Sequence, residues 1–250
     1  MKLARDTWII MVQSLTISLR QRLWGVIGLA QPLYFVILFG PLWERSLRMS
    51  EQDSYATFLP GIFIEVAVFG TLFAGIGLVG EARAGLIERM RVTPISRSAL
   101  LLGRCARDIL MLLVQAVILV LVAIPFGLPV KVVPLALTFL LMSTVAFVAT
   151  SLSYALALAV ESETTLASLA NLINVPLMLL SGILIPIAFA PDWLQTLAKV
   201  NPVYYAVEAS RGLFSGDTTT GALVRALAVV GGVGLLGGFW AVRRFSRAVS

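Results

Sequence analysis

The chain has 250 residues, of which 59% are hydrophobic and 13% charged, and its formal net charge is +6. Soluble domains average about half apolar and about a quarter charged residues, so this composition excludes an ordinary soluble globular protein. The single cysteine, Cys105, and the absence of histidine exclude an internal disulfide and a cysteine–histidine metal site. Because the basic residues are dispersed around apolar runs, they favour membrane orientation, and no nucleic-acid partner is expected.

Residues 1–22 predict an amphipathic helix. Apolar side chains recur at helical spacing at Trp8, Met11 and Leu15, while Arg5 and Asp6 lie off this stripe. A helix of this kind beside a membrane span is expected to lie in the cytoplasmic interface, with Trp8 at the depth of the lipid headgroups.

Six apolar runs fill most of the remaining chain, and each is near the length of ~20 residues that crosses a bilayer as a helix. Backbone polar groups find no partner in lipid, so the runs are expected to be helical. The predicted fold class is therefore an all-α polytopic membrane protein with six transmembrane helices. The runs are Leu23–Leu42, Phe58–Gly80, Ile109–Leu128, Val132–Val160, Leu166–Phe189 and Ala222–Val242.

The distribution of basic residues predicts the orientation of these runs. With both termini in the cytoplasm, 13 of the 19 Lys and Arg residues lie inside and 6 lie outside. The positive-inside rule favours this placement over the reverse.

Residues 81–107 form the longest predicted cytoplasmic loop, which is dense in charge. One helical piece is expected through Glu81–Arg91 and a second from near Ser96, because Thr93-Pro94 disfavours helix between them. A short helix with an apolar stripe suits docking into a groove of a soluble partner. The alternative is a solvated loop whose arginines only set the orientation.

Polar side chains inside the runs are the next anomaly. An ionisable group in a span costs roughly 2.5–3.5 kcal/mol on insertion scales, so Glu65 in the second run should face protein or water. It is either a pathway residue for a cationic or polar cargo, or a proton carrier, or a structural carboxylate that reaches the interface or a neighbouring helix. Asn171 and Asn174 in the fifth run leave the same alternatives open.

Two glycine motifs lie inside predicted spans, Gly75–Gly80 and Gly232–Gly237, and both read GxGxxG. A dinucleotide site would need a preceding strand, so close helix packing is the better interpretation. No lysine follows a glycine, so the chain lacks the phosphate-binding P-loop of ATPases. We therefore expect no catalytic residue, cofactor or metal in this chain.

Residues 190–221 are predicted to lie outside the membrane or to re-enter it. Asp192–Val200 reads as a short interfacial helix that ends at Asn201-Pro202, and Val203–Phe214 reads as another. Pro176, Gly182 and Pro186 interrupt the fifth run, which is expected to cross the membrane and then partly re-enter it.

Two segments resemble the ABC-2 type transporter permeases. GEARAGLIERMRVTPISRSALLLGR resembles the cytoplasmic loop of that family, and NLINVPLMLLSGILIPIAFAPDWLQTLAKVNPVYYAVEASRGLF resembles its C-terminal signature. The chain is most similar to the daunorubicin-resistance branch of drug exporters. The matching positions are Glu81, Gly85, Glu88 and Thr93-Pro94-Ile95-Ser96-Arg97 in the first segment, and Pro176, Ser181-Gly182, Pro186, Trp193-Leu194, Asn201-Pro202, Tyr205 and Arg211 in the second.

The resemblance implies one ABC-2 transmembrane domain over residues 1–250, similar to type V exporters, in a bacterial or archaeal cell membrane. It also implies a dimer with a second permease copy and two copies of a separate ATPase subunit, which holds the ATP and Mg. Such a complex would export an amphipathic drug, natural product or lipid. The second and fifth spans would line the route, and the residues after Ser181 would form re-entrant outer helices.

These expectations assign two groups of functional residues. Glu81, Gly85, Glu88, Arg89, Thr93 and Pro94 are expected to couple the chain to the ATPase, and Glu65, Phe69, Phe73, Asn171, Asn174 and Met178 to line the substrate pathway. Two rival hypotheses remain. One is a stand-alone secondary transporter or channel with Glu65 as proton carrier, and the other is a scaffold whose loop only recruits a soluble protein.

Overall fold

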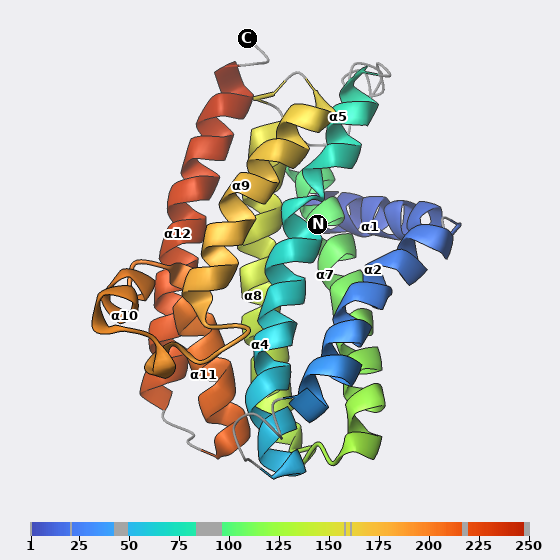
Figure 1. The fold of residues 1–250 in the computed structure, drawn as a ribbon. Coiled ribbons are helices and arrows are strands. Elements are labelled where there is room, and N and C mark those ends of the chain that lie inside the picture. Colours follow the sequence, from blue (N-terminus) through green and yellow to red (C-terminus); the bar gives the residue numbers. More distant parts are fainter. Residues whose placement is uncertain are drawn as a thin grey trace.

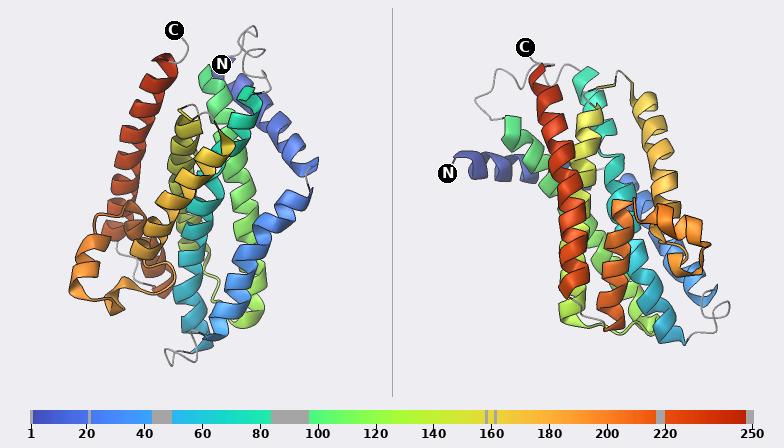
Figure 2. Two further views of the ribbon diagram at one scale, coloured as in Figure 1. Left: turned by 45° about the horizontal axis from the view of Figure 1, so that its top comes forward. Right: turned by 90° about the vertical axis from the view of Figure 1, so that its left-hand side faces the viewer.

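In the computed structural model, residues 2–20, 22–42, 50–83, 97–157, 159–160, 162–216 and 220–247 are described, and every regular element among them is helical. Long helices run side by side in a bundle, and α1 lies across them at one side (Figures 1 and 2). The α-helices are α1 (Lys2–Arg20), α2 (Arg22–Tyr34), α4 (Glu51–Leu72), α5 (Gly75–Arg83), α7 (Arg97–Ala123), α8 (Val132–Ala157), α9 (Glu163–Ser181), α10 (Asp192–Ala198), α11 (Pro202–Ser215) and α12 (Thr220–Arg247). A π-helix, η1 (Phe35–Phe39), continues α2, and two 3-10 turns are η2 (Ile124–Phe126) and η3 (Ile187–Phe189).

Four helical stretches of the described residues are long and apolar enough to cross a membrane: Asp53–Gly80, which joins α4 and α5, Ser98–Phe126, Val132–Ala157 and Glu163–Ser181. The first and sixth predicted runs also form apolar helices within the described residues, over Gly28–Leu42 and Gly221–Gly237, but shorter ones. The chain is therefore a polytopic, helical membrane protein. Six spans remain a prediction.

The ends of the helices fall into two groups (Figure 1). The end of α5, the start of α9 and the end of α12 lie at one end of the bundle, and the starts of α4, α8 and α12 lie at the other. Which end faces the cytoplasm stays a prediction from the charge count.

Helix α4 is the most buried element of the bundle. It contacts α8 and α11, and its residues Phe58, Ile62 and Phe63 have no exposed surface. The Phe63 ring meets the ring of Phe139 on α8 edge to face, with 5.8 Å between centroids. Such aromatic contacts add about 0.5–1.5 kcal/mol beyond area burial, so α4 and α8 form a fixed centre for the bundle.

The second run is interrupted, which the sequence analysis did not anticipate. Helix α4 ends at Leu72, and a turn at Phe73 and Ala74 leads into α5. The Ser153 hydroxyl of α8 bridges this break, because it donates to the Leu72 carbonyl and accepts from the Gly75 N–H at 2.9 Å. A polar group from another helix thus satisfies backbone groups that the break leaves open.

Glycines of both GxGxxG motifs allow close helix packing, as predicted. A Cβ on Gly75 would lie 2.5 Å from the Ser153 carbonyl oxygen, and one on Gly234 of α12 would lie equally close to Val148. A bulkier residue at Gly75 would need a shift of the α8 backbone, and one at Gly234 would need a shift of the Val148 side chain. The interpretation of these motifs as packing surfaces is therefore confirmed for these two glycines.

The predicted loop over residues 81–107 is described only in part. The second helical piece predicted near Ser96 is present as the start of α7, and it continues without a break into the third apolar run. Residues 97–107 are therefore the first turns of a long helix. Thr93-Pro94 lies outside the described residues.

The two short helices predicted after the fifth run are present as α10 and α11, while their place outside the membrane stays a prediction. Helix α9 passes through Pro176 and ends at Ser181, where Gly182 takes a left-handed φ of 75° that favours glycine. The turn η3 and helices α10 and α11 follow, with Asn201 as the N-cap of α11. Helix α11 packs against α4, α8 and α12, while α10 lies at the side of the bundle (Figure 1).

Candidate substrate cavity and its surroundings

A cavity of about 690 Å³ lies between α2, α4 and α7 and extends to α1 and α9. Four of the predicted pathway residues line it together: Glu65, Phe69, Phe73 and Asn171. Glu65 and Phe69 lie four residues apart on α4, and Phe73 follows after the same interval in the turn that ends this helix. The lining residues that sequence reasoning missed are polar ones from other helices: Ser18, Gln31, Arg107, Asp108 and Gln115.

Glu65 is the carboxylate of this cavity with the fewest polar contacts. Its side chain is only 5% exposed, and the Gln31 amide of α2 donates to its Oε1 over a long 3.4 Å. Its other oxygen, Oε2, is buried and has no hydrogen-bond partner among the described residues. Of the alternatives for Glu65, a contact with a neighbouring helix is therefore present, but it occupies one oxygen only.

Asp108 is the bound carboxylate of the same cavity. The Arg107 guanidinium lies 3.0 Å from Asp108 Oδ1, and the Tyr154 hydroxyl of α8 donates to Oδ2 at 2.7 Å. Arg107 also donates from Nη1 to the Ser18 hydroxyl of α1 at 2.7 Å. This chain of contacts joins α1, α7 and α8. The sequence analysis missed these contacts because it placed the start of the third run at Ile109. The charged residues directly before Ile109 belong to the same helix, and they could have indicated a polar contact there.

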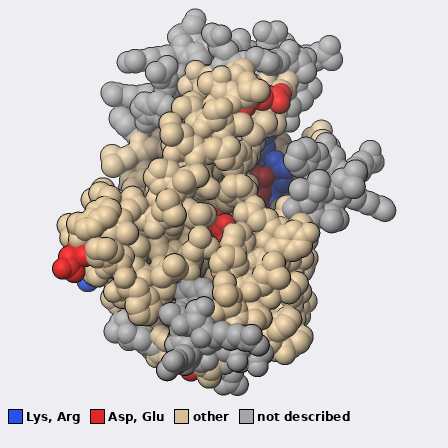
Figure 3. All heavy atoms as spheres, in the orientation of Figure 1, with Lys and Arg blue, Asp and Glu red and all other residues tan. Residues whose placement is uncertain are grey.

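The wall also contains apolar and aromatic side chains. The rings of Phe69 and Phe73 lie 5.1 Å apart at an angle of 57°. Figure 3 shows acidic atoms near the middle of one face, with basic atoms beside one group of them, among uncharged residues. A few charges within a mostly apolar surface suit an amphipathic ligand.

The two remaining pathway residues do not line this cavity. Asn174 is buried, with 6% of its surface exposed, and Met178 packs partly buried against the main hydrophobic core. The Met178 carbonyl also accepts a 2.7 Å bond from the Ser181 hydroxyl at the end of α9. In this single chain, four of the predicted pathway residues therefore line the cavity, and the other two pack inside the protein.

Most predicted coupling residues lie outside the described residues: Gly85, Glu88, Arg89, Thr93 and Pro94. Glu81 belongs to α5, near its end. Helix α1 packs across α7, where Ile10 lies against Gly103. Its other side exposes apolar side chains, with Trp8 65% exposed, as an interfacial helix requires.

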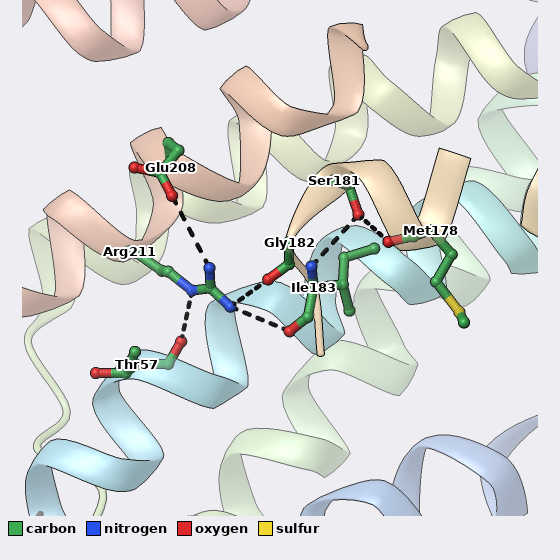
Figure 4. A network of polar contacts seen from close by, with 7 residues as sticks. All are labelled: Thr57, Met178, Ser181, Gly182, Ile183, Glu208 and Arg211. Carbon is green, nitrogen blue, oxygen red and sulfur yellow. Dashed lines mark hydrogen bonds and ion pairs between the residues drawn. The ribbon is translucent and has the colours of Figure 1, made fainter. Parts of the chain in front are cut away.

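Arg211 joins the chain after α9 to the bundle (Figure 4). Its Nη2 donates to the carbonyl oxygens of Gly182 and Ile183 at 2.7 and 3.0 Å, and its Nε donates to Thr57 of α4 at 3.0 Å. Asn201 adds a second link, since its amide donates to the Leu177 carbonyl at 2.7 Å. These residues of the C-terminal signature therefore position the chain after α9.

The comparisons with known proteins identify the family. The model of the ABC-2 type transporter family matches residues 5–215. A transport permease named ycf38 from Cyanophora paradoxa is 30% identical over 82% of this chain and 73% of its own length. The daunorubicin resistance ABC transporter permease protein DrrB1 of Streptomyces coeruleorubidus is 24% identical over 74% of this chain and 66% of its own length. The doxorubicin resistance permease DrrC of Mycobacterium tuberculosis is 22% identical over 80% of this chain and 73% of its own length. The chain belongs to the ABC-2 type transporter family and is a membrane permease of the ABC transporters.

Proposed function

We propose that this chain is the membrane-spanning subunit of an ABC exporter that moves an amphipathic drug, natural product or lipid with ATP hydrolysed by a separate subunit. The observation that carries the proposal is the family match over residues 5–215 in a chain without a P-loop. A permease of this family without its own ATP site needs an ATPase partner.

Contact with the ATPase is assigned to the cytoplasmic side. The charged stretch between α5 and α7, with Glu88 and Arg89, and the interfacial helix α1 are the elements that would touch it. The link from Ser18 of α1 through Arg107 and Asp108 to Tyr154 of α8 supports this assignment. A displacement of α1 would pass along these contacts into the bundle.

A second copy of the chain is proposed to complete the transport route. Helix α9 exposes a row of large apolar side chains, and a partner copy would cover this face. An amphipathic cargo would then meet the polar cavity of each copy on its way. The exposed residues of α9 are Leu172, Ile173, Val175 and Leu179.

The names of two relatives support the class of cargo. They are described as daunorubicin and doxorubicin resistance permeases, which are proteins named for resistance to drugs. The aromatic wall at Phe69 and Phe73 beside the Glu65 carboxylate suits an amphipathic molecule.

The test is reconstitution of the full chain into liposomes with its partner ATPase, which we expect to be encoded beside it. ATP should then drive movement of an amphipathic cargo, and a partner with its P-loop lysine replaced should support none. Transport by the purified chain alone, driven by a proton gradient and lost in Glu65→Gln, would replace the proposal with the secondary-transporter hypothesis. ATPase binding without any flux would support the scaffold hypothesis instead.

A further inference from the structure

We infer that the cavity between α2, α4 and α7 binds the positively charged group of a lipophilic cation, with the Glu65 carboxylate as its counter-charge. The inference deepens the proposed function, because it names the class of cargo, and it rests on that function for its physiological meaning. The binding site itself is a property of this chain alone.

The first observation is that Glu65 has fewer polar partners than Asp108, the other carboxylate of the cavity. In Asp108, Oδ2 accepts a hydrogen bond from Tyr154, and Oδ1 forms an ion pair with Arg107 at 3.0 Å. Glu65 has only the neutral Gln31 amide at 3.4 Å on Oε1, and Oε2 has no partner among the described residues. A buried carboxylate oxygen without a donor is costly, so a ligand that supplies positive charge there would stabilise it.

The second observation is the charge of the cavity as a whole. Its described lining holds two carboxylates, Glu65 and Asp108, and one cation, Arg107. Arg107 is engaged by Asp108 and Ser18, so its charge is compensated within this pair. Among the described lining residues, Glu65 is therefore the acidic group without a basic partner. A bound cation would stabilise its ionised form, more strongly than in water because the surroundings are apolar.

The third observation concerns the body of the ligand. The Phe69 and Phe73 rings lie in the same wall as Glu65, and Val66, Ile76 and Leu112 complete the apolar lining. Aromatic faces attract cations, and apolar side chains accommodate hydrocarbon around the charge. The volume of about 690 Å³ is within the range of small-molecule sites, about 300–1,000 Å³. A small hydrated metal ion would leave most of this wall unused.

The experiment measures binding to the full chain in lipid nanodiscs without an ATPase. The probe is tetraphenylphosphonium, and its near-isosteric anion tetraphenylborate has the same shape with the opposite charge. Empty nanodiscs of the same lipid give the partitioning to subtract. We expect saturable binding of the cation only, at least about tenfold weaker in Glu65→Gln and retained in Glu65→Asp. Asp192→Asn, an exposed acidic position on α10 outside the cavity, should bind the cation like the unmodified chain.

Equal binding of the cation by the unmodified chain and Glu65→Gln would overturn the inference, as would a preference for tetraphenylborate. The thermal unfolding midpoint of Glu65→Gln should equal or exceed that of the unmodified chain, because a buried unpaired charge is removed. Should this variant unfold instead, Phe69→Leu provides the second test, and unchanged cation binding there would also contradict the inference.

Failure of this inference is distinguishable from failure of the proposed function. ATP-driven transport of an uncharged amphiphile, together with no saturable cation binding, would overturn the inference and leave the exporter intact. Cation binding that depends on Glu65, without any ATP-driven transport, would support the inference and overturn the exporter proposal.

Discussion

Arg211 Nη2 lies 2.7 Å from the carbonyl oxygen of Gly182, and this contact joins α11 to the turn that ends α9. Gly182 has a φ of 75°, so its carbonyl leaves the helix and needs a donor from elsewhere. The same guanidinium also reaches Ile183 and, on α4, Thr57. One side chain therefore connects the turn after α9 to the most buried helix of the bundle.

Arg211→Leu should destabilise the protein strongly. It leaves the carbonyls of Gly182 and Ile183 without their donor, and each unsatisfied buried group costs about 1–3 kcal/mol. We expect a lower thermal unfolding midpoint and faster proteolysis after Ser181 in detergent-solubilised protein. Glu208→Gln is the matched control, because Glu208 is about half exposed and lies 3.9 Å from Arg211. Equal stability of both variants would mean that the contacts of Arg211 do not hold this segment.

The helices could be predicted from the sequence where residues close together in the chain determine where a helix begins and ends. Length and hydropathy determine the apolar helices, and Asn201-Pro202 separates α10 from α11 through local backbone preferences. The break after Leu72 could not be predicted, because the group that stabilises it, the Ser153 hydroxyl, lies 81 residues further along the chain. No pattern within the second run identifies such a partner.

The candidate site was likewise predicted only in part from the sequence. Glu65, Phe69 and Phe73 were predicted to line the substrate pathway, and the cavity contains all three. Asn174 was expected beside them and is buried elsewhere. Its surroundings depend on how α9 crosses its neighbours, which the periodicity of α9 alone does not determine. Asp108 and Tyr154 likewise meet only through the packing of α7 on α8.

Gly75→Ala should lower stability, whereas Gly77→Ala in the same motif should not. A Cβ on Gly75 would lie 2.5 Å from the Ser153 carbonyl oxygen, a backbone atom, while one on Gly77 meets nothing within 4 Å. Overpacking costs typically about 1–3 kcal/mol, so the midpoint of thermal unfolding should fall in Gly75→Ala. In Gly77→Ala it should stay or rise, since alanine is the better helix former by about 1 kcal/mol. Similar midpoints for the two variants would refute the packing of α5 on α8.

Tyr154→Phe should weaken the attachment of α7 to α8. The Tyr154 hydroxyl donates to Asp108 Oδ2 at 2.7 Å, and hydrogen bonds to charged groups contribute about 1.5–3 kcal/mol. The ring stays, so the packing is preserved and only the bond is lost. Denaturant or thermal unfolding measures the loss, and Tyr204→Phe, at a partly exposed tyrosine of α11, is the control. If both tyrosine variants unfold alike, the Asp108 contact contributes nothing to stability.

Glu88→Ala should separate ATP hydrolysis from transport without a change in fold. Glu88 belongs to the charged stretch between α5 and α7, outside the described residues, where the family resemblance places contact with the ATPase. Loss of this carboxylate should leave the free energy of unfolding within about 0.5 kcal/mol of that of the unmodified chain. In proteoliposomes with the partner ATPase, it should abolish the part of ATP turnover that cargo stimulates. Asp192→Ala, on α10 in the predicted outer segment, removes one acidic charge away from that contact and should keep the stimulation. Cargo-stimulated turnover that persists in Glu88→Ala would show that coupling uses other residues, with α1 and its Ser18–Arg107 contact as the next element to test.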